Sequence, residues 1–454
     1  MQLRLLIMLL MMSAFAGLRA DEAWPAPRDL GKEIPVYRPP EKPVLTSEDL
    51  VQEPTGSLTL SQALSLALMK NPELRAFSLE VRAAEARALQ AGLFPNPEFG
   101  YEIENFGGSR EFRSLDAAEK TISLGQLIEL GGKRSKRRRL ASLERDLTGW
   151  DHEARRRQVF TEVAQSFAHV LAAQQRVALG EELVRLAEEV NRTVSERVKA
   201  GKVSPIEETK SSVALASNRI ELERTRRELK AARARMASTW GSSRPAFEKT
   251  EGSMEPASGI PSLDQITDLV SNNPDIARWV VEMEQRRAAV KLEESRRIPD
   301  PVISAGTRHF NDTDQTGYVI GVSIPLPIFD RNQGAILESR HRLLQAEEQR
   351  KAAEVAVRTG LSEVYQTLAA SFVETNALKN EVLPGAQSAF DAAVEGYRQG
   401  KFGYLEVLDA QRTLFEARGQ YIRSLEAYFV AAAEVERLIG VSLERVKQGA
   451  DNAQ

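Results

Sequence analysis

The chain has 454 residues, of which 28% are charged, 6% are aromatic and none is cysteine. A formal net charge of −3 gives no indication of a nucleic-acid partner, and the lack of cysteine excludes disulfide bonds as a source of stability. Few aromatic residues among many charged ones are typical of long helices or coiled coils. We therefore expect stability to come from helix packing and from assembly.

Residues 1–20 have the features of a secretory signal peptide. Arg4 supplies a positive charge, residues 5–12 form an apolar stretch, and Ala20 is a small residue before the acidic Asp21. The apolar stretch is shorter than the roughly 20 residues of a spanning helix, although an uncleaved N-terminal anchor is the alternative. We predict an exported protein that is cut after Ala20 and carries no lipid.

A proline-rich segment follows at residues 21–57 and contains seven of the prolines of the chain. Proline-rich chain is extended rather than helical. We therefore expect this segment to run along the outside of the helical part of the protein.

The remainder consists of two copies of one unit, about 200 residues apart. Four landmarks recur in the same order, at 71–72 and 273–274, at 95–97 and 299–301, at 201–202 and 400–401, and at 241 and 440. We assign residues 58–241 to a first repeat and residues 262–440 to a second. A linker at 242–261 joins them, and a C-terminal tail occupies residues 441–454.

Each copy begins with a helix and a β-hairpin. The helix has about 25 residues and ends at a Pro-x-Pro sequence, because proline cannot continue a helix. Two short runs follow in which apolar and polar residues alternate, which is the pattern of strands with one apolar face. We expect the hairpins at about 98–125 and at about 301–325.

The period then changes to that of a long helix. Residues 133–199 contain no proline, and Val159, Val163 and Phe167 recur at helical spacing. Some 65 helical residues extend on the order of 100 Å. Such a length is unusual for a globular domain.

A glycine reverses the chain after each long helix, at Gly201 and at Gly400, since glycine is common just past a helix end. A second helix follows each reversal, at residues 205–240 and 404–439. In the second copy, proline and glycine at 384–385 predict a kink in the long helix.

The strands have the alternation of a membrane β-barrel, with Glu102 and Glu104 on the polar face and apolar residues on the other. Strands cross lipid only in a closed barrel, and four strands cannot close one. Two copies would give roughly eight strands with a filled interior, and three would give roughly twelve with room to conduct. We favour three copies; the alternative is a soluble four-stranded patch packed on helices.

This plan resembles the TolC family of outer-membrane efflux proteins over about residues 58–440. The likeness rests on the Asn-Pro turns, the Pro-x-Pro ends, the reversal at 397–400 and the run at 405–411. It implies a mainly α fold with a membrane β-barrel, built from a duplicated helix–β-hairpin–long helix–helix unit. The homotrimer would form a 12-stranded barrel on an α-helical periplasmic tunnel, with an equatorial belt that includes the linker. Segment 123–134 is similar to the CzcC branch, which exports heavy-metal ions.

Few residues are candidates for chemistry. No two of the four histidines, His152, His169, His309 and His341, have the spacing of metal ligands, so we expect no metal site and no cofactor. We expect His169 to be packed or interfacial. No nucleophile with a base, phosphate loop or paired-carboxylate site stands out, so we predict that the protein is not an enzyme.

The basic residues at 133–134 and 136–139 form a dense positive block. We expect them to make a solvated helix face. The alternative is a belt that meets lipid headgroup phosphates just inside the membrane.

Two acidic residues follow the second reversal. Glu406 and Asp409 are three apart and share one helix face, so a trimer would carry two rings of carboxylates that favour cations. The family resemblance implies that these acids narrow the periplasmic entrance, that Tyr397 helps to latch it, and that Glu207 is its acidic partner on the neighbouring reversal. Phe402 departs from the basic residue of the best-known members. The alternative is that these are solvent-facing acids at a helix start.

These observations predict a passive duct in the outer membrane with a periplasmic helical tunnel. The family resemblance implies that it contacts outer-membrane lipid and works with a periplasmic adaptor (membrane fusion) protein and an inner-membrane pump. The similarity to the CzcC branch implies heavy-metal cations as the cargo, and the alternatives are drug or small-molecule efflux and type I protein secretion. A trimeric coiled-coil envelope scaffold or adhesin is the alternative of another class. The mid-chain strand hairpins argue against it, because stalks of that kind carry their barrel at one terminus.

Overall fold

The structure, a computed structural model, describes residues 53–256 and 258–451. The signal peptide expected at 1–20 and most of the proline-rich segment therefore lie outside the described residues.

The first repeat opens with two helices, and a side chain caps the N-terminus of each. Strand β1 (Gly56–Thr59) leads into α2 (Leu60–Lys70), which Thr59 caps through a reciprocal capping box. The Asn71 side chain then caps α3 (Pro72–Ala91), whose first residue is proline, a position where the missing N–H costs nothing. The helix expected before the Pro-x-Pro sequence is thus α3.

The hairpin and the long helices of this repeat follow as expected. Strands β2 (Glu98–Glu104) and β3 (Glu119–Leu127) flank a loop with a short 3₁₀ turn (Arg110–Arg113). Helix α4 (Lys133–Lys199) has 67 residues, which confirms the predicted length. Helix α5 (Pro205–Ser238) returns along it, with Ser204 as its cap.

The second repeat runs through the same order of elements. They are α6 (Leu263–Thr267), a 3₁₀ turn (Asp268–Asn272), α7 (Pro274–Ser295), β5 (Val302–Phe310), β6 (Gln315–Ser323), α8 (Gln333–Ala377), α9 (Leu383–Arg398) and α10 (Tyr404–Ile439). A π-helical turn (Leu378–Val382) joins α8 to α9 just before Pro384. The chain stays helical through the proline, because the wider π turn changes the hydrogen-bond pattern where the proline has no N–H to donate.

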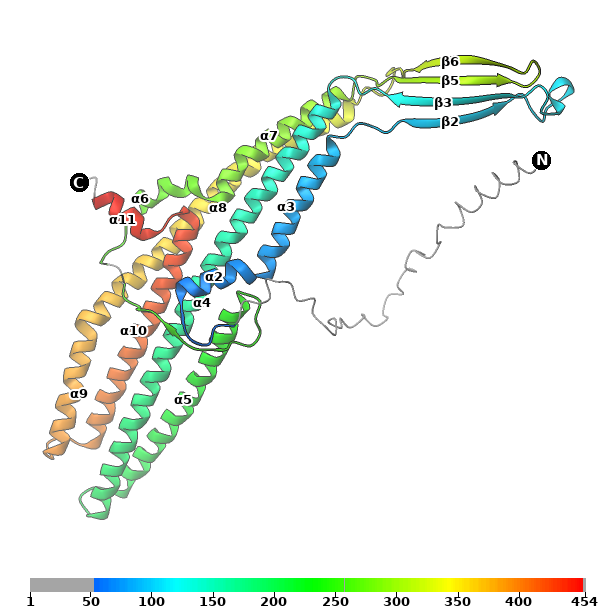
Figure 1. Cartoon of the computed structure of the whole chain (residues 1–454). Helices are drawn as coiled ribbons and strands as arrows, with labels where there is room; N and C mark the ends of the chain where they lie inside the picture. Colours follow the sequence, from blue (N-terminus) through cyan, green and yellow to red (C-terminus); the bar gives the residue numbers. More distant parts are fainter. Residues whose placement is uncertain (1–52, 257, 452–454) are drawn as a thin grey trace. The chain divides into compact units, whose positions relative to one another are not determined.

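The four long strands form one antiparallel sheet in the order β2-β3-β5-β6 (Figure 1). The register aligns Tyr101 with Ile122 on one face, and Glu102 with Thr121 on the other. The first face is rich in exposed apolar side chains, among them Phe99, Tyr101, Leu124, Tyr318 and Ile320. β2 and β6 are the edges of the sheet.

The helices next to the sheet follow the same order as the strands. Helix α4 contacts both α3 and α7, and α7 in turn contacts α8 (Figure 1). In the sheet and in the row of helices next to it, first-repeat elements therefore lie on one side and second-repeat elements on the other. Beyond the middle of α4, its partners are α5 and α10, and α10 also packs on α8 and α9.

Two buried clusters hold the middle of the chain together. One joins β1, α2, α4, the end of α5, β4 (Phe247–Glu251) and α10, and it includes Leu58, Val159 and Trp240. The equivalent cluster of the second repeat joins α6, α8 and α10, with Leu361 and Ile439 fully buried. Within the described part of the chain, no helix combines the length and apolar character needed to cross a membrane.

Two elements were not expected from the sequence. Within the linker, β4 (Phe247–Glu251) pairs in parallel with β1. Within the tail, α11 (Leu443–Asp451) forms a helix whose first residue, Leu443, joins the second buried cluster.

Candidate functional site

The two reversals at the far ends of the long helices are built alike. Gly201 and Gly400 have φ angles of +69° and +74°, a conformation that glycine adopts without strain. The N–H of Lys202 donates to the carbonyl of Arg197, and that of Lys401 to the carbonyl of Gly396. These bonds satisfy helix-end carbonyls, so each reversal is a short, rigid turn.

Tyr397 and Tyr404 form the buried centre of the second reversal. Their side chains are only 8% and 3% exposed, and their ring centroids lie 6.3 Å apart. The Arg197 guanidinium, from the first reversal, sits 4.3 Å above the Tyr397 ring, a favourable cation–π geometry. Val194 of α4 completes this cluster, so it joins both reversals.

Glu207 also faces this cluster. Burial, together with smaller effects of the neighbouring Tyr397 and Glu207, raises the pKa of Tyr404 to about 12. One Glu207 carboxylate oxygen and the Tyr397 hydroxyl are buried without a hydrogen-bond partner among the described residues. Unpaired buried polar atoms are costly, so a partner outside this one chain would stabilise both. The hydrogen bond that we expect between Tyr397 and an acidic residue stays a prediction.

Glu406 and Asp409 lie apart from that buried centre. Both are exposed on the first turns of α10, while Tyr404 and Val407 on the same helix are buried. Asp409 lines a groove of about 720 Å³ between α10 and the α4–α5 pair, together with Tyr404, Leu408 and Arg412. The structure therefore brings Tyr397 and Glu207 to one cluster and leaves the two acids on an open face.

The roles of three residues at this tip were not predicted from the sequence. Tyr404 and Arg197 belong to the buried cluster, and their roles follow from tertiary packing rather than from any local pattern. Phe402 was noted only as a departure, but its ring lies against Gly396, where any side chain would collide with it. An aromatic residue six positions after a glycine, across the reversal, is the signal that could have indicated this contact.

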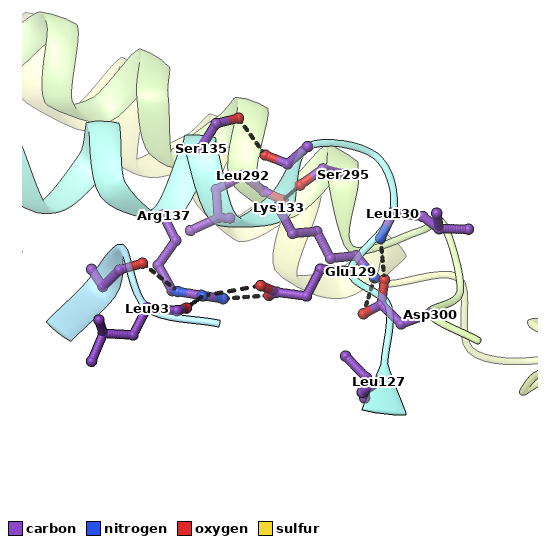
Figure 2. Close-up of polar contacts among 12 residues, drawn as sticks. Leu93, Leu127, Glu129, Leu130, Lys133, Ser135, Arg137, Leu292, Ser295 and Asp300 are labelled. Carbon is purple, nitrogen blue, oxygen red and sulfur yellow. Dashed lines mark hydrogen bonds and ion pairs between the residues drawn. The ribbon is translucent and has the colours of Figure 1, made fainter. Parts of the chain in front are cut away.

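A second polar site lies where the strands meet the helices (Figure 2). Asp300, in the connection between α7 and β5, accepts hydrogen bonds from the Leu130 N–H at 2.8 Å and from the Lys133 ammonium at 2.7 Å. Lys133 also donates to the Ile298 carbonyl. The side chains of Lys133 and Asp300 are only 11% and 20% exposed. This ion pair joins the first repeat to the second.

Arg137 makes the matching link inside the first repeat. It donates to both Glu129 carboxylate oxygens and to the carbonyls of Ala91 and Leu93, at the end of α3 (Figure 2). A planar guanidinium suits such multiple contacts. It fixes the angle between the strand end and the helix start.

The prediction that the basic residues at 133–134 and 136–139 form a solvated helix face is therefore wrong for most of them. Lys133 and Arg137 bind as described, Lys136 donates to the Gly131 carbonyl, and Arg134 covers the Phe94 ring at 3.5 Å. The reason is that the strand–helix junction gathers carbonyls and carboxylates from distant segments. Arg138 and Arg139 are exposed as expected.

His169 is interfacial, as expected. Its Nδ1 lies 2.6 Å from Glu426 of α10, whose other oxygen accepts from Arg176. Burial alone would raise the pKa of Glu426, but the bonds from His169 and Arg176 outweigh it and hold the pKa below its usual value. Among the described residues, no group of three or more His, Asp and Glu side chains is placed to hold a metal ion.

A strand sheet with an exposed apolar face, carried on helices as long as α4, defines an outer-membrane duct of the efflux class. The family model described as "Outer membrane efflux protein" matches residues 63–242 and 266–441, and the chain belongs to this family. The protein is thus an outer-membrane protein with a periplasmic helical tunnel. Each matched segment falls on one copy of the repeated unit.

Particular relatives narrow the comparison. The chain is 36% identical, over 389 residues, to the cobalt-zinc-cadmium resistance protein CzcC of Cupriavidus metallidurans, covering 86% of this chain and 91% of that protein. It is 29% identical to the nickel and cobalt resistance protein CnrC of the same organism, covering 71% of this chain and 76% of that protein.

Solved structures have the same fold. CusC matches with a TM-score of 0.70 at 18% identity, covering 90% of this chain and 99% of that chain. The outer membrane protein VceC of Vibrio cholerae matches with a TM-score of 0.72 at 18% identity, covering 85% of this chain and 96% of that chain.

Proposed function

We propose that this protein is the outer-membrane channel of a tripartite efflux system that exports heavy-metal cations. It conducts passively and catalyses no reaction. A periplasmic adaptor and an inner-membrane pump deliver the cargo and supply the energy. The observation that carries the proposal is the 36% identity to a cobalt-zinc-cadmium resistance protein over most of both chains.

The sheet supports a trimer as the working form. Its apolar face is exposed and its two edges, β2 and β6, are open. Open edges carry unpaired N–H and C=O groups that lipid cannot satisfy. Joining the β6 edge of one copy to the β2 edge of the next removes every edge, and three copies supply a barrel wide enough to conduct.

The tip supports a periplasmic gate. The buried Tyr397 hydroxyl and Glu207 oxygen have no hydrogen-bond partner among residues 53–256 and 258–451 of one copy, and a neighbouring copy can supply one. Glu406 and Asp409 are exposed, and Asp409 lines the groove, so three copies would line the entrance with six carboxylates. Such rings concentrate cations and disfavour anions, which suits a metal cargo.

The test is a deletion strain complemented with the wild-type gene. We expect deletion to lower tolerance of cobalt, zinc, cadmium or nickel several-fold, while tolerance of uncharged drugs stays the same. A relative named as a pyoverdine exporter, 25% identical over 87% of the chain, makes small-molecule efflux the second candidate. Unchanged metal tolerance with loss of drug tolerance, or with loss of a secreted protein, would favour the alternatives.

A further inference from the structure

The polar face of the sheet carries four carboxylates and one guanidinium. The register places Glu98, Glu102 and Glu104 of β2 on this face, together with Glu119 of β3. Arg308 of β5 lies on the same face and is its only basic residue in β2, β3, β5 and β6, all of which the structure describes. Because the opposite face is apolar, this polar face lines the lumen of a membrane barrel.

Three of these charges lie at the end of the sheet that is farthest from the helices. The loop at 105–118 directly follows Glu104 and directly precedes Glu119, and the turn at 311–314 joins β5 to β6 at the same end (Figure 1). Arg308 is two residues before the end of β5. Because the helical tunnel is periplasmic, this end of the sheet is the outer mouth of the duct.

Arg308 binds both carboxylates at this mouth. Its Nη1 donates to Glu119 at 2.9 Å, its Nε donates to the Thr121 hydroxyl at 3.0 Å, and its Nη2 lies 3.1 Å from Glu104. All three nitrogens of the guanidinium are therefore engaged, as its planar fork of donors allows. The Glu119 and Arg308 side chains are partly buried, so this cluster lies against the barrel wall.

Without Arg308 the two acids would face each other unscreened. Glu104 and Glu119 are direct partners in the register of β2 and β3, and like charges opposite each other on neighbouring strands are destabilising. With Arg308 between them, the three side chains carry one net negative charge instead of two. Arg308 thus relieves the repulsion and halves the negative charge of the mouth.

The two acids nearer the helices have no such partner. Glu98 and Glu102 are exposed, and neither forms an ion pair within residues 53–256 and 258–451. A conducting pore must bind a cation well enough to admit it and weakly enough to release it. Free carboxylates along the wall serve the first need, and a neutralised pair at the exit serves the second.

We propose that Arg308 sets the cation affinity of the outer mouth, so that exported cations leave the duct rather than bind there. It acts through Glu104 and Glu119, as a positioning residue, because it offsets their charge and occupies oxygens that would otherwise face the lumen. In three copies, a mouth without Arg308 would present six uncompensated carboxylates. This proposal deepens the proposed function, because it rests on a trimeric channel for cations and names a residue that governs their release.

The test is block of single channels in planar bilayers by hexaamminecobalt(III), added from the outer side. This inert trivalent complex reports charge rather than direct ligation by carboxylates. Arg308→Gln should lower the half-blocking concentration roughly tenfold, because each copy gains a net negative charge in a confined mouth. Arg308→Lys keeps the charge and should stay close to wild type, and block from the periplasmic side should stay the same in both.

A second charge change separates this role from a purely structural one. Glu119→Gln removes a carboxylate and should raise the half-blocking concentration, and it tests the inference if Arg308→Gln does not assemble. Combining Arg308→Gln with Glu119→Gln restores the wild-type net charge, so outer block should return close to the wild-type value although the ion pair is lost. Arg342→Gln is the control, since it breaks an exposed pair with Glu338 on α8 and should change nothing.

Two results would overturn this inference and leave the channel intact. One is outer block that equals wild type in conducting Arg308→Gln and Glu119→Gln channels. The other is a combined variant that is blocked as strongly as Arg308→Gln alone, because charge would then not be the cause. A wild-type protein that forms no pores would overturn the proposed function, and this inference with it.

Discussion

The Asn71 side-chain amide donates to the backbone carbonyl of Thr239, 168 residues further along the chain, at 2.8 Å. Asn273 repeats this bond with the carbonyl of Leu438 at 3.0 Å. In both repeats the same asparagine caps the following helix through its side-chain oxygen. One residue type thus ties the start of each repeat to the end of its last helix.

Replacing Asn71 with alanine should destabilise the protein by about 2 kcal/mol. Loss of the cap accounts for about 1 kcal/mol, and the unpaired Thr239 carbonyl, in a buried setting, accounts for the remainder. Thermal unfolding followed by circular dichroism in detergent measures the change.

Asn71→Asp is the matched variant, because aspartate keeps the cap but cannot donate to Thr239. We expect it to lie between wild type and Asn71→Ala. Equal stability of wild type and Asn71→Ala would mean that the bond to Thr239 contributes nothing.

Asp300→Ala should weaken the joint between the repeats. It removes the acceptor for the Leu130 N–H and the partner of Lys133, a loss of about 1.5–3 kcal/mol for bonds to a charged group. Asp300→Asn retains an acceptor for Leu130 and should lose less. Denaturant midpoints in detergent provide the measurement.

Glu80→Gln is a suitable control for Asp300. Its pair with Arg87 is more than half exposed on both sides, so we expect a change within about 0.5 kcal/mol. If the Glu80 variant lost as much as Asp300→Ala, a general charge effect rather than the joint would be responsible.

Long elements were predictable because many residues repeat the same signal. The bounds expected for α4, at 133 and 199, and for α10, at 404 and 439, agree with the structure. Glycines that flank α4 and α10 mark those ends by local chemistry alone. The β1–β4 pair has only four and five residues, too few for a period to appear, and its pairing joins segments about 190 residues apart.

The sites were less predictable, because their partners come from distant parts of the chain. The sequence around Lys133 predicts a surface charge, because its partner Asp300 lies 167 residues further along the chain. Tyr404 had no distinguishing pattern, since its environment is made by Tyr397 and Glu207 from other elements. Sequence located the tip and the junction, and tertiary packing decided which side chains are buried there.

Alkaline pH should destabilise the tip through Tyr404. Its folded pKa, about 12, exceeds the ordinary tyrosine value of about 10, so the folded state favours the neutral phenol. The corresponding stability is complete below pH 10 and is lost as the pH rises toward 12. Between pH 9 and pH 12, the midpoint temperature of thermal unfolding should fall more steeply for wild type than for Tyr404→Phe. Parallel curves of midpoint against pH would contradict this assignment.

Tyr397→Phe should loosen the closed tip and raise single-channel conductance. The change removes only the hydroxyl, which is buried without a hydrogen-bond partner in the described part of the chain and is expected to bond to a neighbouring copy. We expect a modest rise, because Phe402 already replaces the basic residue expected there, and Glu207→Gln should act in the same direction. Tyr365→Phe is the control: its hydroxyl donates to the Pro261 carbonyl far from the tip, so conductance should not change.

Replacing Glu406 and Asp409 together with alanine should reduce cation selectivity. In three copies the change removes six carboxylates from a narrow entrance, where low-dielectric walls strengthen their attraction for cations. Block by multivalent cations added from the periplasmic side should weaken as well. The same double variant should leave stability nearly unchanged, because both side chains are exposed.

Glu381→Ala with Asp391→Ala is the matched control, since it removes the same charge from exposed positions farther from the tip. Reversal potentials in asymmetric salt, measured on single channels in planar bilayers, compare the three proteins. We expect the Glu406 and Asp409 variant alone to lose selectivity, with a salt dependence that reflects screening over about 10 Å at 0.1 M. If it keeps full selectivity and block, the two acids are ordinary surface residues at a helix start, and the gate lies with Tyr397 and Glu207.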